Sequence, residues 1–330
     1  MKQPPLKQYV YDVYDTVKNA VQPLHPKNQS EKTRALVAVG MVSLFWGTTW
    51  LASKKGVETL PGLQLAGIRQ FLGGSIYLIY FMLIKKHPMP GLKLLMQFVW
   101  MSLLMFVISN GFSTWSLQYI PSGLGAVIGA ISPIWIAIFS VIMIRETKLN
   151  LTTSLGLLLG FMGILIIFYD YLDAFLNTKF TIGIILGIFA TMTWAIGTIY
   201  TVRHARDLNP YYSVGWQMFL SGVILTVTSR VTGQYVPLKE TTPTTWFAIG
   251  YLVIIGSIIT LAAFIYALKR LPPAQASVYA YINPIVAVII GSLLNNEKLN
   301  MVIAGGTLVT LLGVYLVNTG YKKAKLSEET

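Results

Sequence analysis

Long apolar segments dominate this sequence and decide its fold class. An α-helix rises 1.5 Å per residue, so about twenty apolar residues cross a hydrocarbon core of roughly 30 Å. The pattern predicts ten spans, at 35–53, 62–84, 95–116, 122–144, 151–169, 181–202, 210–229, 245–268, 272–294 and 299–319. Only 11% of the residues are charged and 54% are hydrophobic, whereas soluble domains carry about 25% charged residues. We therefore expect an all-α membrane protein rather than a β-barrel, whose strands alternate over short segments.

The second five spans repeat the first five. Matched positions follow in the same order: Trp46 with Trp194, 71–74 with 219–222, Pro121 with Pro272, Pro133 with Pro284, and Glu146 with Glu297. A repeat with an odd number of spans is inserted upside down relative to its twin, and such inverted repeats commonly surround a central transport path. The predicted units are repeat one at 35–169, a linker at 170–180, repeat two at 181–319, and tails at 1–34 and 320–330.

The basic residues predict which way the chain is inserted. With the N-terminus inside, 18 of the 25 Lys and Arg lie in cytoplasmic segments, 6 lie in outer loops, and Arg69 lies within a span. This bias places both termini in the cytoplasm of a multi-pass protein of the cell (inner) membrane. It also accounts for the net charge of +13, so we expect no nucleic-acid partner. The spacing of apolar residues over 9–25 fits an interfacial helix as well as a loosely ordered tail.

Two stretches resemble a known family. The run Phe45-Trp46-Gly47-Thr48-Thr49-Trp50, followed by Pro61 and by Ile68-Arg69-Gln70-Phe71, resembles the opening of an EamA domain. The helix that contains Pro133 and closes at Glu146 resembles the second half of that domain. Two such domains in tandem are similar to the ten-helix EamA branch of the drug/metabolite transporter superfamily. The resemblance implies a bundle with a central cavity that exports, or facilitates the movement of, amino acids and related metabolites.

Arg69 is a charge within a span, about 12 Å along its helix from Pro61. A charge at this depth costs about 2.5–3.5 kcal/mol on insertion scales, so it usually faces a cavity or a partner. A guanidinium in a cavity can hold a carboxylate through paired hydrogen bonds. The alternative is a structural role, in which Arg69 snorkels to the surface or binds helix-end carbonyls. Repeat two carries Gln217 at the matched position, so the two halves are not chemically equivalent.

Aromatic and amide side chains recur within the spans and suit a cavity for amphipathic solutes. Packing and the aromatic belts at the membrane surfaces are the alternative roles for each of them. The predicted substrate-binding residues are Trp46, Arg69, Asn110, Trp115, Trp194, Gln217, Tyr266, Tyr281 and Asn283. Pro133 and Pro284 interrupt the hydrogen bonds of their helices, and each is predicted to be either a hinge or a simple kink.

The acidic residues are informative because of where they are absent. All twelve carboxylates lie in tails, loops or span ends. Exchange of protons for cations in the small multidrug relatives depends on a mid-membrane carboxylate, so that activity is disfavoured. Glu146 and Glu297 are either gates or carboxylates stabilised by the dipole of the helix that follows each of them.

Nothing in the sequence indicates a cofactor or a metal site. The chain has no cysteine, and its three histidines are scattered without metal-ligand spacing. The glycines from Gly123 to Gly129 do not match a dinucleotide fingerprint and suit close helix packing instead. We therefore expect a non-enzymatic transporter of small metabolites that works by alternating access, for which a monomer is sufficient. An intramembrane enzyme acting on lipid-linked substrates is the alternative, and a membrane receptor is a weaker one.

Overall fold

The computed structural model describes residues 31–144, 151–204, 208–271 and 279–328, and this part of the chain is helical without any strand. Eight of the helices described there are long and apolar enough to cross a membrane: Glu31–Gly56, Gly62–Ile84, Leu92–Ser116, Ser122–Ser140, Leu151–Asp170, Thr178–Thr201, Pro243–Leu268 and Met301–Gly320. The all-α membrane prediction is confirmed. The predicted interfacial stretch at 9–25, Glu146 and the start of the span at 272–294 lie outside the described residues.

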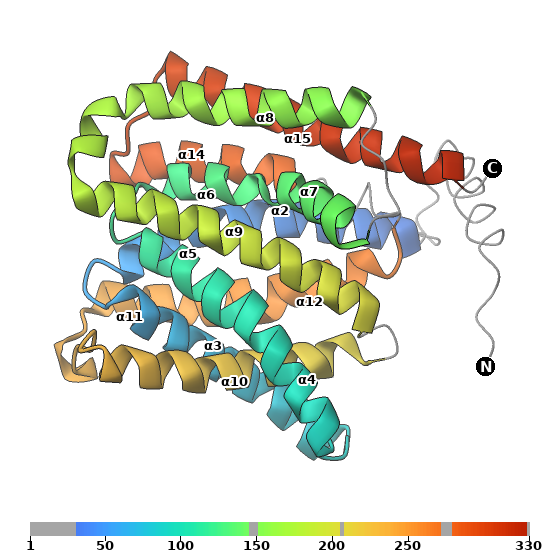
Figure 1. The fold of residues 1–330 in the computed structure, drawn as a ribbon. Helices are drawn as coiled ribbons and strands as arrows, with labels where there is room; N and C mark the ends of the chain where they lie inside the picture. The colour runs from blue at the N-terminus through green and yellow to red at the C-terminus, as the bar shows by residue number, and fades with distance from the viewer. Residues whose placement is uncertain (1–30, 145–150, 205–207, 272–278, 329–330) are drawn as a thin grey trace.

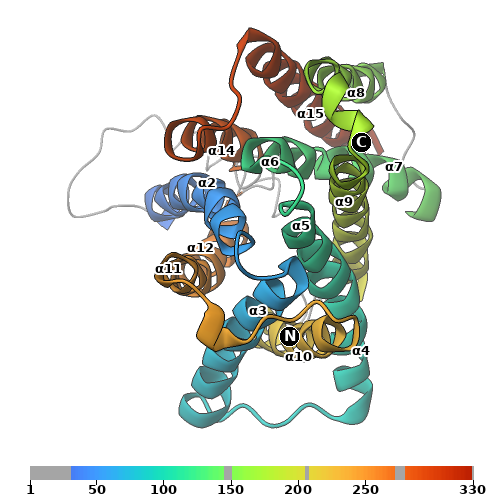
Figure 2. The same cartoon turned by 90° about the vertical axis from the view of Figure 1, so that its left-hand side faces the viewer.

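Two helical series follow one another along the chain. The first series consists of α2 (Glu31–Gly56), α3 (Gly62–Leu78), α4 (Leu92–Ser102) with α5 (Gly111–Ser116), α6 (Ser122–Ala130) with α7 (Ser132–Ile144), and α8 (Leu151–Asp170). The second consists of α9 (Thr178–His204), α10 (Pro210–Val231), α11 (Pro243–Tyr251) with α12 (Thr260–Leu268), α14 (Tyr279–Asn295) and α15 (Met301–Glu328). Figure 1 shows them side by side as one bundle, and Figure 2 shows the same bundle end-on.

Two pairs of corresponding helices, α3 with α10 and α8 with α15, run antiparallel against each other. Along α3 and α10 the close partners are Gly67 with Thr226, Phe71 with Gly222, Gly74 with Phe219, and Tyr77 with Gly215. Along α8 and α15 they are Gly156 with Val317, Gly160 with Gly313, Gly163 with Thr310, and Ile167 with Gly306. In both pairs the number rises on one helix as it falls on the other. The fold is therefore built from two inverted repeats, with the α8–α15 pair at one edge of the bundle and the α3–α10 pair at the other (Figure 2).

Small residues make these antiparallel crossings possible. A Cβ placed on Gly74 would lie 2.7 Å from the Cα of Phe219, and one placed on Gly222 would lie 2.7 Å from the Cβ of Phe71. These are the two runs that the sequence repeat matches to each other. Because helices in a membrane associate through close packing rather than through the hydrophobic effect, the glycines set the distance between α3 and α10.

Three described segments are π-helical and were not predicted. They are Ile79–Ile84, which continues α3, Leu103–Asn110, which joins α4 to α5, and Leu252–Ile259, which joins α11 to α12. The second and third occupy corresponding positions in the two repeats. A π-helical turn leaves backbone groups out of the ordinary helical pattern and often marks a functional site. The Tyr77 hydroxyl on α3 donates a hydrogen bond to the backbone carbonyl oxygen of Ile258, in the third segment, at 3.2 Å. A side chain of a neighbouring helix therefore bonds to the backbone of this π-helical segment.

Within the apolar span Ser122–Ser140, the helix is interrupted between α6 and α7. The break falls at Ile131, two residues before Pro133. Proline has no N–H to give to the carbonyl four residues earlier, which belongs to Gly129. The Ser132 hydroxyl donates to that carbonyl instead, at 2.7 Å, so the break does not leave it unpaired. Pro284 lies within α14, which continues past it.

Candidate functional site

A cavity of about 280 Å³ lies between the two repeats. Its wall is formed in repeat one by α2, α3, α5, α6, α7 and the Leu103–Asn110 segment, and in repeat two by α9, α10, α12, α14 and the Leu252–Ile259 segment. This volume is near the lower end of the range of about 300–1,000 Å³ for ligand pockets. A cavity of this size between the repeats suits a small solute.

The structure brings five of the nine predicted binding residues together in the cavity wall. They are Trp46, Arg69, Asn110, Trp194 and Asn283, and both predicted hinge prolines, Pro133 and Pro284, lie beside them. Trp46 also packs against the rings of Phe264 and Tyr279, at centroid distances of 5.0 and 5.2 Å. The cavity wall is therefore aromatic on its α2–α14 side.

Two other predicted residues, Trp115 and Gln217, lie outside the cavity wall. The Trp115 indole N–H donates to the Tyr119 hydroxyl at 3.2 Å. Gln217 is buried, and its amide donates to the Ser213 hydroxyl one turn away at 2.9 Å. Gln217, the residue matched to Arg69, therefore bonds within its own helix and does not line the cavity. Of these two matched positions, the one in repeat one supplies a side chain to the cavity.

Tyr266 and Tyr281 also lie outside the cavity wall. The Tyr266 ring stacks beneath the Arg270 guanidinium, 3.8 Å from its central carbon. The Tyr281 hydroxyl accepts a hydrogen bond from the Asn318 amide. Both rings therefore make packing contacts, which is the alternative role that the sequence left open for them.

Arg69 carries a charge into the cavity without an acidic partner. Its Nε donates to the Ser257 hydroxyl at 3.0 Å. Among the described residues, no carboxylate pairs with Arg69, and its two terminal nitrogens have no hydrogen-bond partner. None of the described residues that line the cavity is acidic. The geometry leaves a guanidinium with free donors facing a small cavity, which is an arrangement that can bind a carboxylate.

Sequence reasoning missed three polar groups that support Arg69 and its neighbours. The Gln70 amide donates to the Asn110 side-chain oxygen at 2.8 Å, and the Trp46 indole N–H donates to the Gly256 carbonyl at 3.1 Å. Ser257, Gln70 and Gly256 all line the cavity. A serine and a glycine within the apolar run 252–259 were the available signal, since each interrupts a segment that otherwise suits lipid.

Trp50 of α2 contacts two other helices of the cavity wall, α14 and α6. Its indole N–H donates to the Asn283 side-chain oxygen at 3.1 Å. Its ring lies over α6, where a Cβ on Gly129 would be 2.8 Å from the ring and one on Gly125 would be 3.2 Å from it. The glycines of α6 therefore serve close packing, as the sequence predicted, and they receive a tryptophan of α2.

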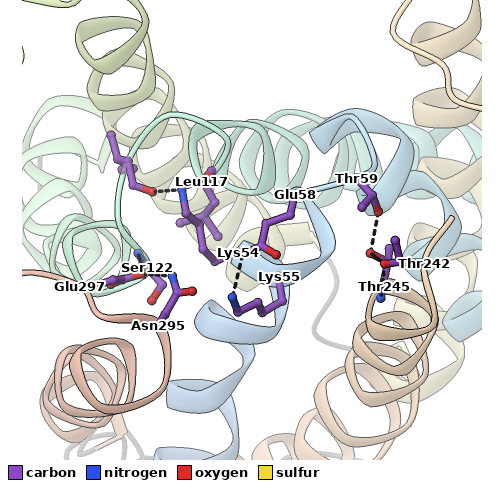
Figure 3. A network of polar contacts seen from close by, with 11 residues as sticks. Lys54, Lys55, Glu58, Thr59, Leu117, Ser122, Thr242, Thr245, Asn295 and Glu297 are labelled. Atoms are coloured by element: carbon purple, nitrogen blue, oxygen red, sulfur yellow. Dashed lines mark hydrogen bonds and ion pairs between the residues drawn. The ribbon is translucent and has the colours of Figure 1, made fainter.

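Polar contacts gather at the end of the bundle where α2, α5 and α14 finish, which we call the Glu297 end (Figure 3). The Glu297 carboxylate accepts hydrogen bonds from the backbone N–H groups of Ser122, at 2.8 Å, and Gly123, at 2.9 Å. The expectation that Glu297 serves the helix following it is wrong, because it caps α6 of the other repeat. Asn300 caps α15 instead, its side-chain oxygen accepting from the Ile303 N–H at 2.9 Å.

The pKa of Tyr171, which lies beside the Glu297 end, is shifted by burial and by nearby charges. Burial raises the pKa of Tyr171 to about 12, and the carboxylates of Glu297 and Asp170 add to that rise. The Asp170 carboxylate in turn pairs with the Lys298 ammonium at 2.8 Å. Within the described residues, no group of three histidine, aspartate or glutamate side chains is arranged to hold a metal ion.

Comparisons with known proteins match this architecture. The model of the EamA-like transporter family matches residues 33–169 and again 181–319. An uncharacterised inner membrane transporter of Escherichia coli, YedA, is 31% identical over 84% of this chain and 88% of its own length. The uncharacterised transporter YoaV of Bacillus subtilis is 25% identical over 89% of this chain and 99% of its own.

A plant relative and a solved structure extend the same likeness. A WAT1-related chloroplastic protein of Arabidopsis thaliana is 27% identical over 83% of this chain and 67% of its own length. A crystal structure with 14% sequence identity superimposes with a TM-score of 0.60 over 88% of this chain and 99% of the other, which shows the shared fold. The chain therefore belongs to the EamA-like transporter family, and it is a multi-pass membrane transporter rather than an enzyme.

Proposed function

We propose that this transporter moves small metabolites that carry a carboxylate, amino acids or their derivatives foremost, as an exporter or facilitator. The observation that carries the proposal is the Arg69 guanidinium, which faces a cavity of about 280 Å³ with unpaired terminal nitrogens. Trp46, Asn110, Trp194 and Asn283 line the same cavity and contact the rest of the solute in this proposal.

The charge of the cavity supports an acidic substrate. Arg69 is the charged side chain in the described cavity wall, and no carboxylate is there to balance it. An anionic group entering the cavity gains charge-assisted hydrogen bonds, which are about twice as strong as neutral ones. A solute with a net positive charge would meet the guanidinium without compensation. The aromatic rings around Trp46 offer an apolar surface for the remainder of an amphipathic solute.

Alternating access is the mechanism that an inverted repeat favours. In this proposal the repeats 35–169 and 181–319 rock against each other around the cavity, with the tails 1–34 and 320–330 in the cytoplasm. Pro133 and Pro284 act as hinges, since each lies where its helix lacks a main-chain hydrogen bond and both line the cavity. A monomer holds the whole cavity, so transport needs no second copy.

We expect the cavity to be reachable from each side of the membrane in turn. The chain has no cysteine, so Thr191→Cys gives one reactive thiol in the cavity wall, where Thr191 is 5% exposed. A membrane-impermeant methanethiosulfonate should modify it from either face, as measured in right-side-out and in inside-out vesicles. The cysteine-free parent is the control. Modification from one face alone, whatever the conditions, would contradict alternating access.

The charge bias gives a separate prediction for orientation. Both chain ends should lie in the cytoplasm, because 18 Lys and Arg fall on that side and 6 on the other. Fusions at residue 330 to alkaline phosphatase, active outside, and to green fluorescent protein, fluorescent inside, report the side directly. Fluorescence without phosphatase activity is expected. An active phosphatase fusion would reverse the assignment of inner and outer faces.

A further inference from the structure

Two adjacent residues of α3 are held by corresponding segments of the two repeats. Arg69 donates through Nε to the Ser257 hydroxyl, in the π-helical segment Leu252–Ile259 of repeat two, at 3.0 Å. Gln70 donates to Asn110, at the end of the corresponding π-helical segment of repeat one, at 2.8 Å. The segments that depart from ordinary helix geometry are therefore the ones that contact the cavity residues of α3.

Ser257 occupies one edge of the guanidinium and leaves the other to a ligand. An arginine has five N–H donors in a fixed fork, and the bond to Ser257 uses the one on Nε. Gly256 allows this placement, because a Cβ there would lie 3.2 Å from an Arg69 terminal nitrogen and 3.0 Å from the Thr49 methyl group. We propose that Ser257 is a positioning residue that fixes Arg69 so that its two terminal nitrogens meet a carboxylate end-on. This inference rests on the proposed function.

Ser257→Ala removes the hydroxyl that orients Arg69 and leaves the charge in place. The probes are L-phenylalanine and L-phenylalaninamide, which differ in whether the carboxylate is present and therefore in net charge, and binding to purified protein is measured directly. We expect about fivefold to tenfold weaker binding of the acid and unchanged binding of the amide. Ser43→Ala is the matched control, because the Ser43 hydroxyl is also buried but donates to the Val39 carbonyl of its own helix at 2.8 Å and lies outside the cavity wall. It should leave both affinities unchanged.

A double-mutant cycle separates positioning from a general loss of structure. In an Arg69→Gln background, Ser257→Ala should have no further effect on binding of the acid, since its role acts through Arg69. Equal effects of Ser257→Ala and Ser43→Ala, with Arg69→Gln still harmful, would overturn the positioning role alone. Wild-type protein that binds both probes equally, or that binds no L-amino acid of a panel measured in the same way, would overturn it together with the acid-binding role of Arg69.

A different observation carries a second inference, at the Glu297 end. The Glu297 carboxylate comes from the connection between α14 and α15 and binds the first two N–H groups of α6, in the other repeat. It folds back over α14, where a Cβ on Gly291 would lie 2.5 Å from its Oε2. A carboxylate at a helix N-terminus is stabilised by the dipole and by the unpaired N–H groups.

Lys54 makes the complementary contact beside it (Figure 3). Its ammonium donates to the backbone carbonyls of Leu117, at 2.7 Å, and Ile120, at 3.0 Å. The preceding residue, Ser53, lines the cavity, and so does Leu117. We propose that Glu297 and Lys54 form a latch that closes the cavity at this end, so that both contacts must part before a solute passes.

Access to Ser53 measures whether the latch is closed. A Ser53→Cys variant carries one thiol in a residue that is 5% exposed, and its modification by a membrane-impermeant methanethiosulfonate is timed from the Glu297 end. Adding Glu297→Gln should raise the rate about tenfold, because a neutral amide binds the two N–H groups less strongly. Lys54→Met should raise it as well, from the other half of the latch.

The neighbouring Lys298 provides the matched control. It pairs with Asp170 outside the latch, so Lys298→Gln should leave the labelling rate unchanged. Folding of each variant is checked by its thermal stability in detergent. Unchanged labelling in folded Glu297→Gln and Lys54→Met proteins, or an equal increase in Lys298→Gln, would overturn the latch.

Discussion

Arg69→Gln should weaken binding of a carboxylate-bearing solute by about tenfold to a hundredfold, while binding of the corresponding amide, which lacks the negative charge, does not weaken. A hydrogen bond to a charged group contributes about 1.5–3 kcal/mol, and 1.4 kcal/mol corresponds to a factor of ten in affinity. Arg69→Lys should fall between the two, because an ammonium keeps the charge but cannot form paired bonds with one carboxylate. Equilibrium binding of radiolabelled acid and amide to purified protein measures both.

Glutamine is a suitable replacement because Gln217 fills the matched position of the other repeat. The control is Arg230→Gln, which removes an arginine from the exposed end of α10, where it contacts Tyr235. This variant should bind both solutes normally. A structural role for Arg69 predicts a lower melting temperature with normal affinity per folded molecule. Normal affinity in a stable Arg69→Gln protein would remove Arg69 from the site.

Gly222→Ala should destabilise the protein by about 1–3 kcal/mol, the usual cost of adding a methyl group to a filled space. The new Cβ would meet Phe71 of α3, including its Cβ at 2.7 Å, and much of what it meets is backbone that cannot rotate away. Gly74→Ala should behave alike, since its Cβ would meet the Cα of Phe219 at the matched crossing, also at 2.7 Å. Thermal unfolding in detergent measures the loss.

Gly40→Ala is the matched control for these two changes. Gly40 lies within α2, and a Cβ there would have no neighbour within 4 Å. Alanine in that place favours the helix by about 0.5–1 kcal/mol relative to glycine. Its melting temperature should therefore stay the same or rise. Comparable destabilisation by all three changes would contradict the account of the α3–α10 crossing.

The helical architecture and its inverted repeat could be predicted from the sequence for two physical reasons. A bilayer fixes the length of an apolar helix, and an odd number of spans in each repeat forces inversion. The matched runs at 71–74 and 219–222 pack against each other because their small residues let α3 and α10 cross closely. The repeat in the sequence identifies these runs as corresponding positions, whereas the contact between them was found only in the structure.

The sequence predicted the candidate site only in part, because it does not show how each helix is rotated about its own axis. Trp46 and Trp115 are both tryptophans within spans, yet only the first lines the cavity. Arg69 and Gln217 are matched in sequence, but the glutamine bonds to Ser213 within its own helix. Which side of a helix faces the cavity depends on packing between segments far apart in the chain.

The contacts of Glu297 and Ser257 were hidden for a related reason. A carboxylate just before α15 suggests a cap for that helix, but the nearest unpaired N–H groups in space belong to α6. The π-helical segment around Ser257 departs from the ordinary 3.6-residue period, so apolar periodicity could not find it. Both features arise where the repeats meet, and sequence patterns report mainly on the helix in which they lie.

Solute flux tests the central claim most directly. Purified protein is placed in liposomes loaded with an unlabelled L-amino acid, and entry of the same labelled amino acid is followed with the proton gradient and membrane potential collapsed. For at least one member of a panel of amino acids, we predict saturable counterflow that its amide does not support and that Arg69→Gln abolishes or greatly slows. Protein that is folded, yet moves no member of the panel with or without an imposed gradient, would contradict the account.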